Sequence, residues 1–189
     1  MLIAVAATAP GTCQKRSEDR MPTLCRAKGQ GRHESHVWAD HYQCYLEDAA
    51  AEADTSRVWD DRTVKAHLAV DAGLIAIGTA RYGGQVDVAI ELHREEPPDE
   101  LDAWDHVVSA SVTFPSGQLT LSSPSSPNDP DNPTLVVPPG TYRFLARYRG
   151  LNEIPPEDVD GEPEEGPDRY ELVLWPGPPV ELAVLKQWA

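Results

Sequence analysis

The sequence of 189 residues lacks the features of membrane-spanning proteins and of small disulfide-stabilised proteins. No stretch approaches the ~18 consecutive apolar residues that a membrane-spanning helix needs. Three cysteines, Cys13, Cys25 and Cys44, make an odd number, so they predict no disulfide framework and favour a reducing compartment. Basic residues are also few: 16 Lys and Arg stand against 31 Asp and Glu, and the formal net charge is -15.

Motifs of known catalytic chemistry are absent as well. The sequence contains no Gly-x-Ser-x-Gly, no Ser-x-x-Lys and no His-Glu-x-x-His arrangement. His67, His93 and His106 could each lie beside a carboxylate in three dimensions, but a chain with 6 His and 31 acidic residues produces such pairs by chance. We therefore predict a non-catalytic protein without a cofactor. A hydrolase whose site is assembled across strands is the alternative.

Two segments carry residue types that bind metals. The run His33-x2-His36-x4-His41-x2-Cys44 offers zinc ligands. On one continuous strand over residues 37–46, however, His41 and Cys44 point to opposite faces. The segment Asp158-Val159-Asp160-Gly161 resembles the start of a calcium loop, but the closing glutamate does not follow in register. The sequence therefore predicts no metal site in either segment.

Charge is unevenly distributed along the chain. Residues 1–35 hold six basic and three acidic residues, a net charge of +3, which leaves -18 for residues 36–189. Residues 95–105 contain six carboxylates and residues 153–168 contain eight, with no basic residue in either run. A negative field of this size repels nucleic acid and anionic lipid and attracts basic proteins. Solubility alone is the competing explanation of the charge.

Apolar and polar residues alternate with period two from Val37 onward, which predicts strands. The pattern is clearest in residues 85–93, where Val86, Val88 and Ile90 share one face. Further strands are expected over residues 37–46, 74–80, 108–114, 118–122, 135–137, 141–149, 169–175 and 180–186. Many short strands separated by Gly and Pro predict an all-β fold, an antiparallel β-sandwich over residues 36–189. Residues 1–35 are expected to be an irregular extension that is either disordered or includes a non-native start, with Met21 as the native one.

The segments between the strands carry turn residues. Tyr82-Gly83-Gly84-Gln85, Pro115-Ser116-Gly117 and Pro138-Pro139-Gly140 predict three hairpins, because glycine reaches positive φ without strain and proline pre-sets φ. Asp60 or Asp61 is expected to cap one short helix that runs to Val70. A Pro- and Ser-rich loop over residues 122–134 is expected to be mobile, and the acidic loop over residues 153–168 is expected to be solvated.

The order of these elements resembles a known family. A strand ending His41-Tyr42-Gln43-Cys44-Tyr45 precedes Trp59 with its acids and a helix-like stretch that closes on Asp71-Ala72-Gly73. A hairpin over residues 74–93, a longer strand to Phe114, residues 117–121 and the segment Pro138-Pro139-Gly140-Thr141-Tyr142-Arg143-Phe144 complete the outline. Over residues 37–150, and more weakly 168–186, this is similar to the competence protein J family of small acidic β-sandwich proteins. The resemblance implies a sandwich fold and the role of the described member, inhibition of a DNA-entry nuclease, but it transfers no inhibitory residues.

Charge and resemblance lead to one functional hypothesis. We expect a cytoplasmic, non-catalytic binding protein, an inhibitor or immunity-type protein that masks a basic nuclease or toxin. Two tryptophans beside carboxylates would anchor the partner, with charge at the rim. The predicted partner-binding residues are Trp59, Asp60, Asp61, Glu95, Glu96, Asp99, Glu100, Asp102, Trp104 and Asp105.

Two alternatives stay open. A carbohydrate- or ligand-binding β-sandwich would use the tryptophans as stacking platforms and could hold calcium at the acidic loops. For location, residues 1–9 resemble the apolar part of a signal peptide, but no basic residue precedes them, so secretion is the lesser expectation.

Overall fold

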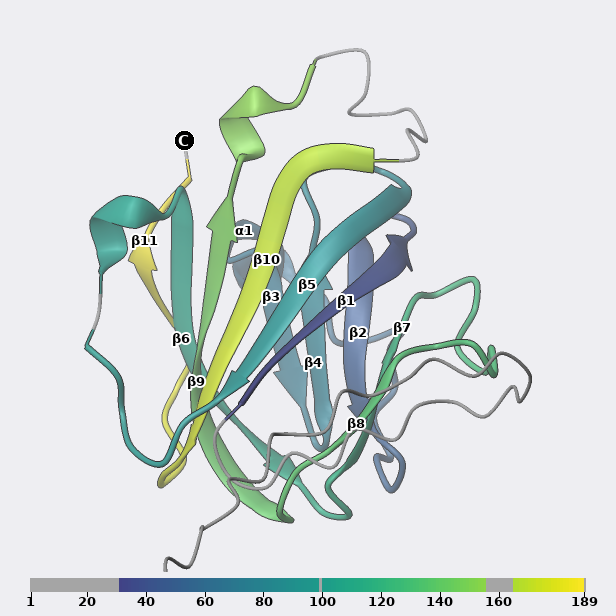
Figure 1. Cartoon of the computed structure of the whole chain (residues 1–189), viewed down its shortest axis with the longest axis vertical. Coiled ribbons are helices and arrows are strands. Elements are labelled where there is room, and N and C mark those ends of the chain that lie inside the picture. Colours follow the sequence, from purple (N-terminus) through teal and green to yellow (C-terminus); the bar gives the residue numbers. More distant parts are fainter. Residues whose placement is uncertain (1–30, 99, 156–164, 189) are drawn as a thin grey trace, which may run out of the picture.

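The structure, a computed structural model, describes residues 31–98, 100–155 and 165–188, which form two β-sheets packed face to face (Figure 1). The six-stranded sheet has, in spatial order, β1 (Gly31–Ala39), β5 (Gly84–Leu92), β10 (Glu165–Pro176), β9 (Gly140–Arg149), β6 (His106–Phe114) and β11 (Ala183–Lys186). The five-stranded sheet has β3 (Leu68–Asp71), β4 (Leu74–Gly78), β2 (Gln43–Asp48), β7 (Gln118–Ser122) and β8 (Thr134–Val136). Neighbouring strands are antiparallel, except that β10 runs parallel to β5. The predicted all-β sandwich is confirmed.

Helical segments are short. The single α-helix of the described residues, α1, spans Asp61–Lys65, and two 3-10 turns span Leu101–Ala103 (η1) and Leu151–Glu153 (η2). Within the same residues, no helix has the length and apolarity to cross a membrane.

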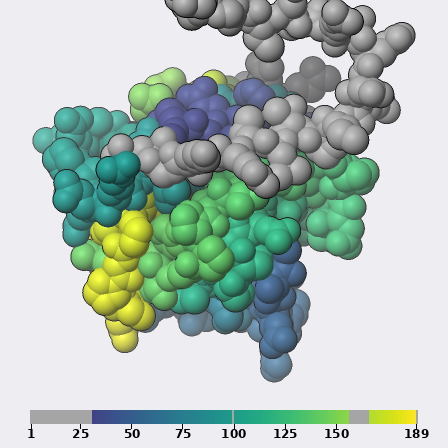
Figure 2. All heavy atoms as spheres, turned by 60° about the horizontal axis from the view of Figure 1, so that its bottom comes forward, coloured from purple at the N-terminus to yellow at the C-terminus, as the bar shows by residue number. Residues whose placement is uncertain are grey.

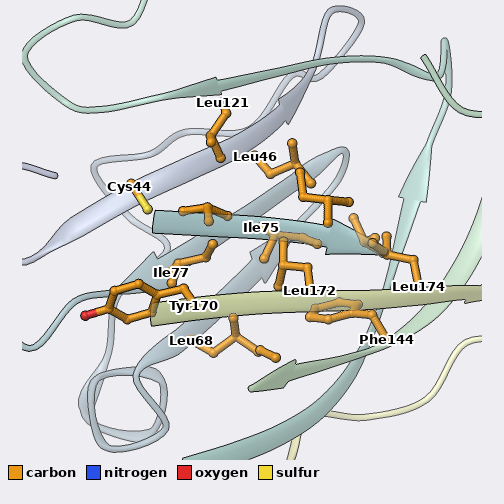
Figure 3. Packing of buried hydrophobic residues seen from close by; sticks show 14 of the residues in the cluster. Cys44, Leu46, Leu68, Ile75, Ile77, Leu121, Phe144, Tyr170, Leu172 and Leu174 are labelled. Atoms are coloured by element: carbon orange, nitrogen blue, oxygen red, sulfur yellow. The ribbon is translucent and has the colours of Figure 1, made fainter. Parts of the chain in front are cut away.

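The core lies between the sheets, because each strand turns every second side chain inward. Leu46 and Ile75 from the five-stranded sheet meet Phe144 and Leu172 from the six-stranded sheet in this layer (Figure 3). The intervening residues of each strand point to one of two outward faces, which lie on opposite sides of the sandwich. This alternation decides which functional side chains can share a surface.

The three predicted hairpins are wrong, although the turns exist. Each of them joins strands of different sheets: β4 to β5, β6 to β7 and β8 to β9. Gly and Pro specify a local chain reversal, but they do not specify whether the next strand pairs in the same sheet or crosses to the facing one. Figure 2 shows the end of the sandwich at which the last two turns cross, with the green residues at its centre and the yellow C-terminal segment along one side.

Two further expectations about local structure are wrong. The segment 37–46 is not one strand, because β1 ends at Ala39 and β2 begins at Gln43 in the other sheet. The helix ends at Lys65, and Leu68 and Val70 belong to β3, whose partner β4 follows after a turn at Gly73 with φ of 74°. An apolar residue every few positions fits a helix or a buried strand equally well, so the pattern alone does not separate them.

The predicted boundary at residue 36 lies inside β1, which begins at Gly31. Of the two long loops, residues 122–134 contain short turns closed by backbone hydrogen bonds, such as Ser126 N to Ser123 O at 3.1 Å. Most of the acidic loop, residues 156–164, lies outside the described residues. Its last carboxylate is not solvated as expected, because Asp168 is fully buried and pairs with Arg81.

Candidate functional site

The predicted partner-binding residues lie on two opposite sides of the sandwich. Trp59 packs on the outward face of the five-stranded sheet, in a cluster with Tyr45. Trp104 packs on the outward face of the six-stranded sheet, in a cluster with Trp175. Asp99 lies outside the described residues. Because both sheets separate the two tryptophans, the predicted set does not form one surface.

Arginines, not carboxylates, lie against the ring of Trp104. The guanidinium carbons of Arg147 and Arg149 are each 5.6 Å from the ring centroid, within the range of cation–π attraction. Glu96, from the predicted set, is paired with Arg143 at 3.0 Å. The expected acidic ring around Trp104 is therefore wrong, because β9 projects its outward arginines into this region.

The remaining carboxylates of residues 95–105 are scattered around η1. Asp105 accepts a hydrogen bond at 3.0 Å from the backbone N–H of Leu151, which ties the start of β6 to η2. Glu95, Glu100 and Asp102 are exposed.

The outward face of the six-stranded sheet is largely neutralised by ion pairs. Arg32 contacts Glu91 and Glu171, both at 2.5 Å, and Arg169 contacts Asp87 at 2.6 Å. Opposite charges alternate across neighbouring strands, which stabilises the sheet pairing. Glu91, Glu171 and Asp87 of this face are thus paired, whereas Glu95, Glu100 and Asp102 at its edge are exposed.

The other half of the predicted set surrounds the start of α1. Asp60 is the N-cap: its carboxylate accepts from the backbone N–H groups of Arg62 at 3.0 Å and Thr63 at 2.8 Å. The hydrogen bond from Thr63 leads the contacts that lower the pKa of Asp60. Asp61 follows in the first turn and is exposed. Both side chains are accessible from solvent.

A hollow of about 350 Å³, which we call the aromatic cleft, lies beside this helix start. Its walls come from the β1–β2 turn, Trp59, α1, the residue before β3 and the end of β4. The lining residues are His41, Tyr42, Gln43, Trp59, Val64, His67, Gly78 and Thr79. Tyr42 and Val64 keep 38% and 56% of their surface exposed, so apolar groups face solvent at this site.

One wall of the cleft continues into a histidine pair. The ring of His67 lies 5.5 Å from that of His106 and 5.3 Å from that of Trp188, between centroids. Burial lowers the pKa of both histidines, and the charge of His106 adds to the shift at His67. Both imidazoles are therefore neutral at pH 7, so His67 contributes no positive charge to the cleft.

No group of three or more potential metal ligands occurs among the described residues. Cys44 points into the core, fully buried, and burial raises the pKa of its thiol to about 12. A thiol in that state is neither a nucleophile nor a metal ligand.

Of the residues that line the cleft, the sequence predicts only Trp59 as a site residue. The strand expected over residues 37–46 includes His41 and Tyr42, and the helix expected to run to Val70 includes His67. The missed signal is the run Asp40-His41-Tyr42-Gln43, whose ends pair with each other as an isolated bridge. A bridge such as that between Asp40 and Gln43 depends on where the two sheets approach each other. The residue types of the segment do not specify that position.

Two solved structures have this fold, and the superposition with this chain covers almost the whole length of each. A protein described as crocagin biosynthetic gene J superposes with a TM-score of 0.53 at 22% identity, over 79% of this chain and 99% of that chain. ComJ from Bacillus subtilis, an inhibitor of the DNA-degrading activity of NucA, superposes with a TM-score of 0.55 at 13% identity, over 78% and 98%. No family model matches the chain, and no curated protein does. At these identities the likeness concerns architecture, and this protein has a ComJ-like fold.

Proposed function

We propose that this protein is a non-catalytic inhibitor that binds a basic protein partner, with a DNA-degrading nuclease as the partner class. The observation that supports this most is the ComJ-like fold, since ComJ is a nuclease inhibitor. Nucleases hold phosphates with Lys and Arg, so a carboxylate-bearing surface is complementary to their active sites.

The side of the five-stranded sheet carries an excess of acidic over basic residues. Residues 40–71 hold eight acidic residues against three basic ones. Five of those carboxylates are exposed: Glu52, Asp54, Asp60, Asp61 and Asp71. On the outward face of the six-stranded sheet, by contrast, arginines of β1, β9 and β10 pair with Glu171 and Asp87. This asymmetry supports the α1 side, with the aromatic cleft, as the partner-facing surface.

The direct test measures DNA degradation by nucleases of the protein's own host, with and without this protein. Nucleases encoded beside its gene are tested first. We expect inhibition that weakens steeply as salt rises from ~0.05 to ~0.5 M, because the association is electrostatic. Asp60→Asn with Asp61→Asn should weaken inhibition about fivefold or more, and Asn preserves the N-cap.

A matched control is Asp129→Asn with Asp131→Asn. It changes the net charge equally, but the β7–β8 loop lies at the opposite edge of the five-stranded sheet from α1 and β3. The control should inhibit like the parent protein. Equal loss in both variants would mean that only total charge matters, and absence of inhibition of any host nuclease would refute the proposed function.

The aromatic cleft favours a second candidate, a site for a carbohydrate or small ligand, because Trp59 and Tyr42 both line it. Stacking of a sugar on an aromatic ring responds little to salt. Ligand binding that persists at high salt, without nuclease inhibition, would therefore replace the inhibitor proposal with this one.

A further inference from the structure

The β1–β2 turn has a backbone that its residues do not favour. Asp40 and Gln43 exchange both backbone hydrogen bonds, at 3.0 and 3.1 Å, around two central residues. Those residues, His41 and Tyr42, have φ of 52° and 60°. Positive φ at both positions is the signature of a type I′ turn, for which Asn-Gly is the preferred pair. Here two large rings occupy those positions instead.

A third residue repeats this conflict. His67 follows the C-cap of α1 with φ of 49°, in the position where helices most often carry Gly. Among the described residues, His41, Tyr42 and His67 are the non-glycine residues with positive φ, and all three line the aromatic cleft. Residues held against their backbone preference gather at functional sites, where the side chain is needed in spite of the strain.

The turn side chains are also held in place. Tyr82 lies behind them, with its ring centroid 5.2 Å from that of His41 and 5.5 Å from that of Tyr42. Asp40 contacts His41 Nδ1 at 2.9 Å. On the facing wall, the indole N–H of Trp59 donates to the side-chain oxygen of Gln43. The cleft is therefore preorganised, which reduces the entropy lost when a ligand binds.

The chemistry of the cleft selects a long cationic side chain. Tyr42, Trp59 and Val64 give apolar walls that suit methylene groups, and an arginine guanidinium stacks on aromatic faces. The carboxylate of Asp40 lies 2.9 Å from His41 Nδ1, and Asp60 and Asp61 directly follow the lining residue Trp59 in the chain, so acidic residues adjoin the residues that line the cleft. We infer that the aromatic cleft binds the side chain of an arginine presented by the protein partner. This inference rests on the proposed function, whose partner is basic.

The first experiment uses N-acetyl-L-arginine amide as the probe, titrated into the ¹⁵N-labelled full chain. We expect saturable shifts of the Trp59 indole N–H and of the Tyr42 and His67 amides. The norleucine and phenylalanine analogues should bind at least fivefold more weakly. Tighter binding of the phenylalanine analogue would show that the cleft binds apolar side chains. The absence of a saturable shift with any probe would show that the cleft does not bind a side chain. Either result overturns the inference.

Two variants separate binding from folding. His41→Asn with Tyr42→Gly gives the turn its preferred residues, so we expect a melting temperature no lower than that of the parent but loss of arginine binding. Val64→Arg places a competing cation at an exposed position of the cleft and should abolish binding without a change in melting temperature. Val184→Arg, the same change at an exposed valine of β11, is the control and should bind like the parent. Unchanged probe binding in Val64→Arg would contradict the inference.

The same variants distinguish this inference from the proposed function. If the host nuclease is inhibited equally by the parent and by Val64→Arg, the inhibitor proposal stands and the arginine site is wrong. If the cleft binds the probe and Val64→Arg abolishes this, but no host nuclease is inhibited, the arginine site stands and the inhibitor proposal is wrong.

Discussion

At the scale of single residues, the strongest constraints come from polar groups inside the sandwich. Arg81 and Asp168 retain 1% and 0% of their side-chain exposure and form an ion pair at 2.8 Å. The other oxygen of Asp168 accepts a hydrogen bond from the Tyr170 hydroxyl at 2.7 Å. Burial raises the pKa of Tyr170 well above its usual value, with the charge of Asp168 adding to the shift. The network joins the β4–β5 crossing to the start of β10.

Removing one partner of the Arg81–Asp168 ion pair should destabilise the fold. Arg81→Met leaves a buried carboxylate without its cation, and we expect the free energy of unfolding to fall by about 3–5 kcal/mol. Urea denaturation of both proteins measures the loss. Arg81→Met with Asp168→Asn removes both charges and should recover part of it. A loss of less than about 1 kcal/mol in the single variant would show that the pair adds little.

The histidine pair makes stability depend on pH. His106 Nε2 donates to Ala66 O at 2.8 Å and its Nδ1 accepts from Trp188 N at 3.1 Å, an arrangement that requires the neutral ring. Because burial lowers the pKa of His67 and His106 in the folded state, their stabilising contribution is present above the unfolded value of 6.5 and is lost as pH falls below it. Melting temperatures from pH 8 to pH 5 should decline accordingly. His106→Gln should flatten the decline.

At the scale of elements, a carboxylate fixes the crossing from β6 to β7. Asp48, at the end of β2, is 1% exposed and accepts from the backbone N–H groups of Ala50, Ser116 and Gly117 at 2.8, 3.1 and 2.7 Å. Burial alone favours its protonated form, but the hydrogen bonds from Ser116, Ala50 and Gly117 outweigh this and lower its pKa. Gly117 completes the turn with φ of 69°, and a Cβ there would lie 2.1 Å from Val137 O.

Removing this carboxylate should loosen the crossing. We expect Asp48→Ala to reduce the free energy of unfolding by about 2–4 kcal/mol, because several buried donors lose their acceptor. Asp48→Asn keeps an acceptor and should lose less. Chemical denaturation supplies both values, and equal losses in the two variants would contradict the hydrogen-bond explanation.

Sequence patterns predicted elements better than their pairing. The strands over residues 85–93, 108–114 and 141–149 were found because period-two alternation reports which side of a strand is buried. Gly and Pro at residues 83–84, 115–117 and 138–140 marked the reversals, but sheet membership depends on contacts such as those of Asp48, which are distant in the chain. The site was predicted in part for the same reason: Trp59 and Asp60 are neighbours in sequence, whereas His41 and His67 join them only through strand pairing.

At the scale of the whole molecule, charge is divided between two sides. Ion pairs cover the outward face of the six-stranded sheet, while the exposed carboxylates of residues 40–71 outnumber the bases near them. The tryptophans follow the same division, because Trp104 lies under arginines and Trp59 beside carboxylates. Charge is thus balanced across the strands on one side, and acidic residues exceed basic ones on the other.

This division predicts the response of stability to salt. A net charge of -15 destabilises the compact state by self-repulsion, which salt screens, and the ion pairs of the six-stranded face are partly buried and screened less. We expect the melting temperature to rise by about 2–4 °C, equivalent to about 1 kcal/mol, between ~0.02 and ~0.2 M NaCl. Asp129→Asn with Asp131→Asn removes two of the negative charges, which weakens the self-repulsion and should reduce the rise. A melting temperature that falls over this range would mean that ion pairs outweigh repulsion, and the negative side would then be too weakly charged to steer a partner.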